Sequence, residues 1–199
     1  MVEQHPLKPF LPPHSRILML GSFPPPRTRW SMDFFYPNFI NDMWRIFGIV
    51  FRGDKLAFVD VPNKSFKLDE IRKLLTQKGI AIYDTATEVN RLNNNASDKF
   101  LEIKTPTNVF SLLKHIPQCS AVCATGGKAA EELSSQLGAE VPKTGECTRF
   151  ENDCREYLFY KMPSSSRAYP MSLERKAEFY HKMFLEMGIL QDKKFHSHT

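Results

Sequence analysis

The sequence lacks the features of several common protein classes. No hydrophobic run approaches the roughly 18 residues that a membrane helix needs. The first residues do not show the basic-then-apolar layout of a secretory leader. We therefore expect a cytoplasmic protein that does not insert into membranes. The motifs Gly-x-Gly-x-x-Gly and Gly-x₄-Gly-Lys-Ser/Thr are also absent, which disfavours a nucleotide-binding or nucleotide-hydrolysing enzyme on a Rossmann-like sheet.

Cysteines are few, and their spacing does not suggest a metal site. The chain has 4 of them, with no Cys-x-x-Cys. Cys119 and Cys123 share one apolar segment, where a four-residue spacing places both on one face of a strand. We predict buried, reduced thiols rather than ligands. We expect no metal and no organic cofactor.

What the sequence does contain is an ordinary globular composition with a mild basic bias. Hydrophobic residues make up 42% and charged residues 25% of the 199 positions, which indicates one packed domain rather than a disordered chain. The formal net charge is +5, and Arg27 and Arg29 lie in one loop. Nucleic acid would suit this charge, because phosphate contacts supply much of the affinity of such complexes. A solvated basic surface would explain it equally well.

Apolar runs and helical stripes alternate along the chain. We predict strands at 16–20, 80–84, 120–124 and 156–162. We predict helices at about 39–50, 68–78, 105–115, 128–137 and 172–187. This alternation is typical of a parallel sheet covered by helices on both faces. Residues 1–15 should form an extended arm, 16–188 a single domain, and 189–199 a disordered tail.

The unusual loops all follow predicted strands. They span residues 21–38, 84–98, 125–127 and 163–171. Because the carboxyl ends of parallel strands meet at one edge of a sheet, where ligands bind, we expect one composite site there. The first loop carries a run of aromatic residues followed by two asparagines. Aromatic rings suit a flat ligand and amides can bond to its edge, so this loop indicates a base-binding pocket.

Four segments together resemble the uracil-DNA glycosylase superfamily. The similarity is greatest to its hypoxanthine-DNA glycosylase-like branch, with the mismatch-specific uracil glycosylases more distant. It extends from about residue 10 to residue 186. The matching segments are, in chain order, Gly-Ser-Phe-Pro at 21–24 with Asn-Asp-Met-Trp at 41–44, then 79–84, 126–129, and Met-Pro-Ser-Ser-Ser-Arg-Ala at 162–168.

The resemblance implies a fold and an activity. The fold is a three-layer α/β/α sandwich with a short, mostly parallel four-stranded sheet. The activity is that of a monofunctional, monomeric DNA glycosylase of base-excision repair. Such an enzyme hydrolyses the N-glycosidic bond of a deaminated base, uracil or hypoxanthine, that is flipped out of DNA.

Three positions depart from the patterns of the superfamily. Phe23 stands where many members have Asp, Asn or Glu, Met162 where the uracil-specific enzymes have His, and Arg167 where the closest branch has Pro. These departures leave an alternative open. The protein would then be a catalytically inactive binder of nucleic acid or damaged bases on the same fold.

The resemblance assigns the chemistry to the first loop. Asn41 is the predicted catalytic residue, because Phe23 can neither orient water nor donate to the base; the alternative is that Asn41 pins the first helical turn. Asn38 is a second catalytic candidate and the better candidate for a helix cap. Tyr36 occupies the stacking position of the mismatch-specific relatives, unless it only packs at the rim. The predicted base-binding residues are Gly21, Ser22, Phe23 and Tyr36.

DNA contacts are predicted mainly on the last loop. Serine hydroxyls and amides before a helix suit phosphates, although ordinary turn and capping bonds would also use them. Arg167 and Tyr169 lie where relatives insert a wedge, or are simply exposed. Lys128 at a helix start suggests a phosphate contact, because its charge opposes the helix dipole. The predicted DNA-binding residues are Pro163, Ser164, Ser165, Ser166, Arg167, Tyr169 and Lys128.

Overall fold

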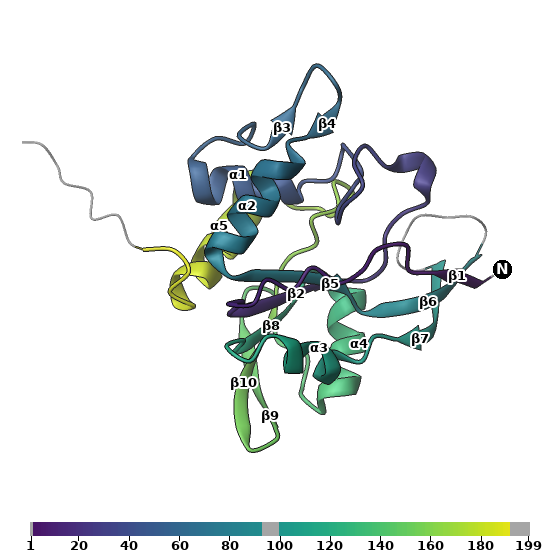
Figure 1. The fold of residues 1–199 in the computed structure, drawn as a ribbon, viewed down its shortest axis with the longest axis vertical. Coiled ribbons are helices and arrows are strands. Elements are labelled where there is room, and N and C mark those ends of the chain that lie inside the picture. The colour runs from purple at the N-terminus through teal and green to yellow at the C-terminus, as the bar shows by residue number, and fades with distance from the viewer. Residues whose placement is uncertain (1, 93–99, 192–199) are drawn as a thin grey trace, which may run out of the picture.

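A computed structural model describes residues 2–92 and 100–191. Its centre is a five-stranded sheet with the strand order β5–β2–β8–β10–β9 (Figure 1). The strands are β2 (Ile17–Gly21), β5 (Ile80–Asp84), β8 (Ala121–Ala124), β9 (Cys147–Asn152) and β10 (Arg155–Lys161). The first four in the sheet are parallel, and β9 pairs antiparallel with β10. The sheet therefore has one strand more than we predicted.

Burial accounts for the strands that the sequence revealed. All residues of β2, β5 and β8 are buried, as a parallel sheet covered on both faces requires. Their near-continuous apolar runs are consequently easy to recognise. The edge strand β9 consists mainly of polar residues, and Phe150 is its one buried residue. Its sequence pattern therefore resembles that of a loop.

Helices cover both faces of the sheet (Figure 1). One layer consists of α1 (Met43–Arg52), α2 (Leu68–Lys78) and α5 (Leu173–Glu186). The other consists of α3 (Val109–His115) and α4 (Gly127–Leu137). The predicted three-layer α/β/α sandwich is confirmed. None of the helices in the two described ranges is long and apolar enough to cross a membrane.

Several helix ends differ from the prediction. The first helix begins at Met43 rather than near residue 39, with Asp42 at the N-cap position in place of Asn38. Residues Thr105 and Pro106 belong to a strand, and α3 starts only after Asn108, whose side chain accepts a bond from the Ser111 amide at 2.9 Å. The predicted helix start at residue 105 was wrong because Pro106, which would suit the first turn of a helix, ends a strand instead.

Other predicted ends are confirmed. Ser172 caps α5 by accepting a bond from the amide of Arg175 at 3.2 Å. Gly79 ends α2 in the left-handed region at φ 66°, a conformation that glycine adopts without steric cost.

A second, smaller sheet lies beside the main one, with the antiparallel order β1–β6–β7 (Figure 1). It contains β1 (Val2–Gln4), β6 (Ala86–Arg91) and β7 (Leu101–Pro106). Residues 86–91, which we predicted to lie in the loop 84–98, form β6. The rest of that predicted loop, from residue 93, lies outside the described residues, as does the tail from residue 192.

The N-terminal segment is tied to both sheets. Through β1 it extends the small sheet, and Phe10 forms a bridge to Ile82 of β5. The Arg91 guanidinium, whose side chain is nearly buried, pairs with Glu3 at 3.0 Å. These contacts lead the segment across the edge of the main sheet that β5 forms.

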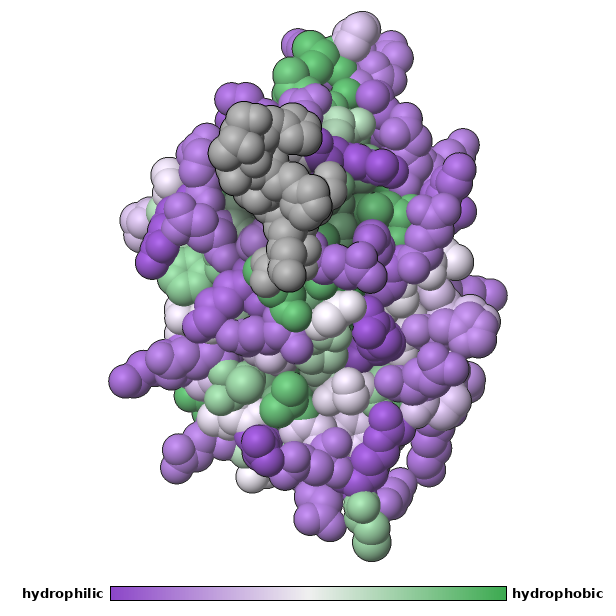
Figure 2. Space-filling view, turned by 90° about the vertical axis from the view of Figure 1, so that its left-hand side faces the viewer, coloured by the Kyte–Doolittle hydropathy of each residue, from purple (hydrophilic) through white to green (hydrophobic). Residues whose placement is uncertain are grey.

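The short elements complete the outer surface. They are the short 3₁₀ helix η1 (Arg27–Arg29) and the hairpin of β3 (Val59–Asp60) and β4 (Ser65–Phe66). Hydrophilic residues predominate on the face in Figure 2, with small hydrophobic patches between them, one of them at the hairpin end of the molecule. Leu56 and Val61 are among the exposed hydrophobic residues.

Candidate functional site

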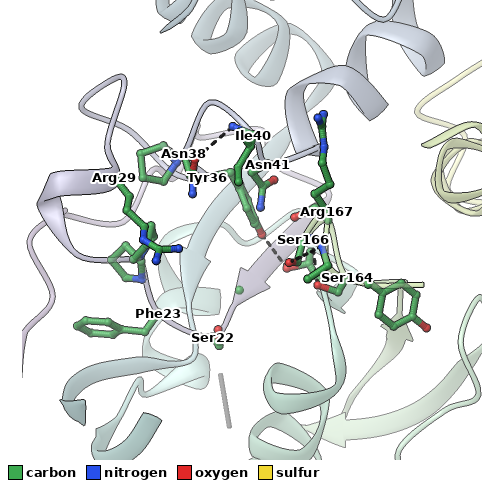
Figure 3. A pocket seen from close by; sticks show the side chains of 18 of the residues that line it. Ser22, Phe23, Arg29, Tyr36, Asn38, Ile40, Asn41, Ser164, Ser166 and Arg167 are labelled. Atoms are coloured by element: carbon green, nitrogen blue, oxygen red, sulfur yellow. Dashed lines mark hydrogen bonds between the residues drawn. The ribbon is translucent and has the colours of Figure 1, made fainter. Parts of the chain in front are cut away.

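A pocket of about 620 Å³ lies at the carboxyl ends of the four parallel strands. This volume falls within the range of small-molecule sites. Each of the four predicted loops contributes residues to it, so the loops converge on one pocket (Figure 3). Its lining residues are Gly21, Ser22, Phe23, Pro24, Pro25, Arg29, Tyr36, Pro37, Asn38, Ile40, Asn41, Asp84, Thr125, Gly127, Ser164, Ser165, Ser166, Arg167, Ala168, Tyr169 and Pro170.

Gly21 ends β2 at a point where a side chain has no space. A Cβ atom built on it would lie 2.4 Å from Oδ1 of Asp84 and 3.4 Å from the hydroxyl of Tyr36. The glycine therefore lets a carboxylate and a phenol approach the end of the strand. Tyr83 adjoins Asp84 in β5, and burial, followed by the charge of Asp84, raises its pKa to about 12.

Tyr36 is held in a strained conformation at the pocket wall. Its φ is 51°, which is uncommon for a bulky residue. The Thr125 hydroxyl donates to the carbonyl of Leu20 at 3.3 Å, so the Tyr36 hydroxyl donates to Thr125 at 2.8 Å. Trp44 meets the Tyr36 ring edge-on at a centroid distance of 6.1 Å. Strain held by several contacts is typical of functional positions.

Asn41 points into the pocket (Figure 3). Its Oδ1 accepts a hydrogen bond from the amide of Met43 at 2.9 Å, which pins the first turn of α1. The amide hydrogens on Nδ2 are the side chain's donors. The structural role and the proposed chemical role thus use different atoms of the same side chain.

Asn38 also lines the pocket, but it does not cap α1. Its Oδ1 accepts from the amide of Ile40 at 3.2 Å, closing a turn before the helix. Arg45 stabilises this segment by donating to the carbonyls of Phe39 at 2.7 Å and Asn41 at 3.0 Å. Burial lowers the pKa of Arg45, and the nearby charge of Arg167 lowers it further.

Phe23 contributes to the pocket wall, but its ring turns away from Asn41 and Tyr36 (Figure 3). The ring packs in a small cluster with Ala86, Val89 and Leu101 of the second sheet. It also meets the imidazole of His5 edge-on at 5.2 Å. The loop after β2 is therefore anchored by a hydrophobic residue that packs against the second sheet.

The serine loop, residues 163–171, is fixed by a buried ion pair that sequence reasoning missed. Lys176 of α5 donates to Oδ2 of Asp42 at 3.0 Å and to the carbonyl of Ser166 at 2.8 Å, with its side chain 0% exposed. The Asp42 amide donates to the carbonyl of Ser165 at 2.9 Å. Lys176 adjoins the buried Ala177 in α5. The sequence did contain a signal for this ion pair, because Lys176 falls on the apolar face of the predicted last helix, where a charged residue needs a partner.

The predicted DNA-binding residues divide into two groups. Ser164, Ser165, Ser166, Arg167 and Tyr169 line the pocket. Pro163 is buried and does not line the pocket, and its carbonyl accepts from the Tyr180 hydroxyl at 3.1 Å. Lys128 does not line the pocket, although its neighbour Gly127 does.

Two arginines lie on opposite sides of the pocket (Figure 3). Arg29 comes from η1. Arg167 comes from the serine loop and donates to Oδ1 of Asp42 at 3.2 Å while 56% of its side chain stays exposed. A pocket between two cations suits a ligand with phosphates on either side of a neutral group. Arg27, also noted from the sequence, lies outside the pocket lining and stacks on Trp30 at 4.0 Å.

The cysteine prediction is confirmed for two residues. Cys119 and Cys123 are buried and free, although only Cys123 lies within β8, because the strand begins at Ala121. Burial raises the pKa of the Cys119 thiol to about 11 and that of Cys123 further. Cys147 and Cys154 are exposed. Within the described residues, no cluster of His, Cys, Asp or Glu side chains could hold a metal ion.

Comparisons with known proteins find similarity in fold only. No family model matches the chain, and no curated protein matches its sequence. Among solved structures, a solution NMR structure from Methanosarcina acetivorans, described as a "putative uracil DNA glycosylase", aligns with a TM-score of 0.58. The two chains are 22% identical, and the alignment covers 92% of this chain and 99% of the other. This likeness agrees with the α/β/α fold expected from the motifs.

Proposed function

We propose that this protein is a DNA glycosylase that hydrolyses the N-glycosidic bond of a deaminated base, uracil or hypoxanthine, flipped into the pocket. One observation carries the proposal: a pocket large enough to admit a base lies between two arginines and combines an inward-pointing amide, a constrained tyrosine and the serine loop. The fold shared with the Methanosarcina acetivorans protein supports the same kind of function.

Each feature has a role in the reaction. Cleavage passes through an oxocarbenium-like sugar while negative charge develops on the leaving base. Nδ2 of Asn41 would donate to that base, and the Tyr36 ring would stack on it, a contact worth roughly 1–3 kcal/mol. The hydroxyl oxygens of Ser164 and Ser166 accept bonds from the amides of Ser166 at 3.2 Å and Ala168 at 3.3 Å. Their hydroxyl hydrogens would donate to the phosphates beside the extruded nucleotide.

The pocket also favours a monofunctional enzyme. A lyase step needs an amine that attacks the sugar and forms a Schiff base. Among the described residues that line the pocket there is no lysine. The buried amine of Lys176 is engaged with Asp42 and Ser166. Water would therefore be the nucleophile, and an intact abasic strand would be the product.

A catalytically inactive binder is the second candidate. It is favoured by Phe23, whose ring packs into the second sheet instead of presenting a polar group to the pocket. Such a protein would bind a strand containing uracil, hypoxanthine or an abasic site and leave every glycosidic bond intact.

Base release distinguishes the two candidates. Single- and double-stranded oligonucleotides carrying one uracil or hypoxanthine are incubated with the protein, and abasic sites are then cleaved with alkali. We expect cleavage of at least one substrate by the native chain. Intact strands in every sample, with the protein bound to them, would establish the inactive binder.

Two substitutions at position 41 test which atom acts. Asn41→Asp keeps the oxygen that accepts from Met43 and removes the Nδ2 donor, whereas Asn41→Ala removes both. We expect both variants to lose about 10²–10³ of the rate, the usual effect of losing one positioned donor. Asn63→Ala, in the β3–β4 turn, is the matched control and should retain full activity. Native rates in Asn41→Asp would limit Asn41 to its role in the turn.

A further inference from the structure

The pocket contains a carboxylate that the proposed roles leave unused. Asp84 ends β5, lines the pocket and has a side chain that is 9% exposed. It is the one acidic residue among the described residues of the lining. Its Oδ1 lies so close to Gly21 that a Cβ at residue 21 would come within 2.4 Å of it.

The other oxygen of this carboxylate is held by the N-terminal segment. Oδ2 of Asp84 lies 2.8 Å from Nε2 of His5, whose side chain is 2% exposed. A carboxylate only accepts hydrogen bonds, so Nε2 must carry the hydrogen and donate it. Nδ1 faces the amide and carbonyl of Leu7 at 3.1 and 2.9 Å. Neutral imidazole and imidazolium both fit this arrangement with the same bond to Asp84.

The surroundings of His5 hold it in this orientation. Its ring packs against Tyr83 at a centroid distance of 4.6 Å and against Phe23 at 5.2 Å. Tyr83 adjoins Asp84, and Phe23 belongs to the loop after β2. The packing thus gives a physical reason for a phenylalanine at position 23: it supports the histidine that orients the carboxylate.

The reaction requires an acceptor that Asn41 is poorly placed to provide. A water molecule that attacks the sugar must be oriented by a group that accepts its hydrogen. Oδ1 of Asn41 already accepts from the Met43 amide at 2.9 Å, which leaves Asn41 chiefly as a donor. Asp84 lines the same pocket from the end of a different element and is an acceptor by chemistry.

We propose that Asp84 is a catalytic residue that orients and deprotonates the attacking water, and that His5 is its positioning residue. This inference rests on the proposed glycosylase function. The bond between C1′ and the base nitrogen breaks, and its electron pair leaves with the base. The water oxygen bonds to C1′ while one of its protons passes to Asp84 and then to solvent. The base departs as an anion stabilised by Asn41 and is protonated by water.

The N-terminal segment is then part of the active site. His5 lies just after β1, on the chain that crosses to the edge formed by β5. The carboxylate and its partner are 79 residues apart in the sequence.

Three substitutions test this assignment in the full chain. Asp84→Asn keeps the shape of the side chain and removes its basicity. His5→Gln places an amide nitrogen near the position of Nε2, whereas His5→Asn replaces only the acceptor at the position of Nδ1. His14→Asn, an exposed histidine of the same segment that contacts Gln118, is the control. Denaturant unfolding shows that each variant is folded.

Two readouts are measured with the substrate that the native chain cleaves. One is the single-turnover rate of base release at saturating protein. The other is the affinity for the same strand with a 2′-fluorinated nucleotide, whose glycosidic bond resists cleavage.

We expect the rate of base release by Asp84→Asn to fall about 10²–10⁴-fold, as for a missing general base, without weaker binding. His5→Asn should lose about 10–100-fold, the usual cost of removing an orienting partner. His5→Gln should recover much of that loss.

The outcomes separate this inference from the proposed function. No base release by the native chain overturns both. Base release by the native chain with a native rate in Asp84→Asn overturns the assignment of Asp84 alone. Equal losses in His5→Gln and His5→Asn, with weaker binding, would make His5 a structural anchor and overturn its positioning role.

Discussion

Replacing Lys176 should destabilise the protein far more than replacing a surface lysine. Lys176→Met removes the ammonium group that pairs with Asp42, whose side chain is 7% exposed. It also removes the bond to the carbonyl of Ser166. Breaking a buried pair from one side costs about 3–5 kcal/mol, because a charge is left buried without its partner. Arg167 keeps its contact with Oδ1 at 3.2 Å, which favours the lower end of that range.

The measurement is urea unfolding followed by tryptophan fluorescence, because Trp44 is fully buried. A loss of 3–5 kcal/mol corresponds to a fall in Tm of roughly 6–20 °C for a chain of this size. Lys182→Met is the control, since Lys182 forms an exposed pair with Glu186 at 3.7 Å and should cost under about 1 kcal/mol. The double variant Asp42→Asn/Lys176→Met should recover part of the loss. Equal effects of the two lysine substitutions would refute the buried ion pair as a support of the serine loop.

Three further predictions concern the pocket and the thiols. Gly21→Ala should cut the rate of base release by at least about tenfold, because its Cβ would lie 2.4 Å from Oδ1 of Asp84 and a misplaced active-site group can cost about 10²-fold in rate. An unchanged single-turnover rate would contradict a clash between this Cβ and Asp84. Tyr36→Ala should weaken binding of a base-containing strand by about 1–3 kcal/mol, measured against the same strand with an abasic site, whose affinity should not change. Two thiols should react with a thiol reagent at pH 8 in the folded chain and four in denaturant, because a pKa raised to about 11 leaves only about one part in a thousand of Cys119 as thiolate. Four rapid reactions in the folded chain would show that Cys119 and Cys123 are accessible.

The parallel core of the fold was predictable because its strands are buried on both faces. An uninterrupted apolar run as short as residues 17–20, followed directly by a glycine, is typical of a strand in the middle of a covered sheet. The parallel direction of these strands also follows from their alternation with helices. The edge strand β9 was not predictable from its sequence, since its residues are mainly polar and largely solvated.

The small sheet escaped prediction for a different reason. Its strands β1 and β6 pair across more than eighty residues of sequence, and no local pattern marks such a partner. Pro106 ends β7, but a proline after threonine also resembles a helix start. The local sequence of these segments predicted a loop and a helix start. The structure is decided instead by strand pairing, which brings β1 to β6 from a distant part of the sequence.

The site was predictable as a location and less so as a set of contacts. The loops after the strands do converge, and most predicted residues line one pocket. Two buried polar pairs around the pocket were not predicted: His5 pairs with Asp84, and Lys176 pairs with Asp42. A histidine in the arm and a lysine in a helical stripe look ordinary in sequence. Only the folded chain brings each within 3.0 Å of its carboxylate.

The most direct test of the central claim is to identify the released base itself. Oligonucleotides containing one uracil or one hypoxanthine are incubated with the native chain, and free bases are separated and quantified by mass spectrometry. The proposed glycosylase predicts free uracil or hypoxanthine in a 1:1 ratio to abasic sites, with the sugar–phosphate strand uncut before alkali. Strands that remain bound to the protein with no free base in solution would contradict it and establish a binding protein on this fold.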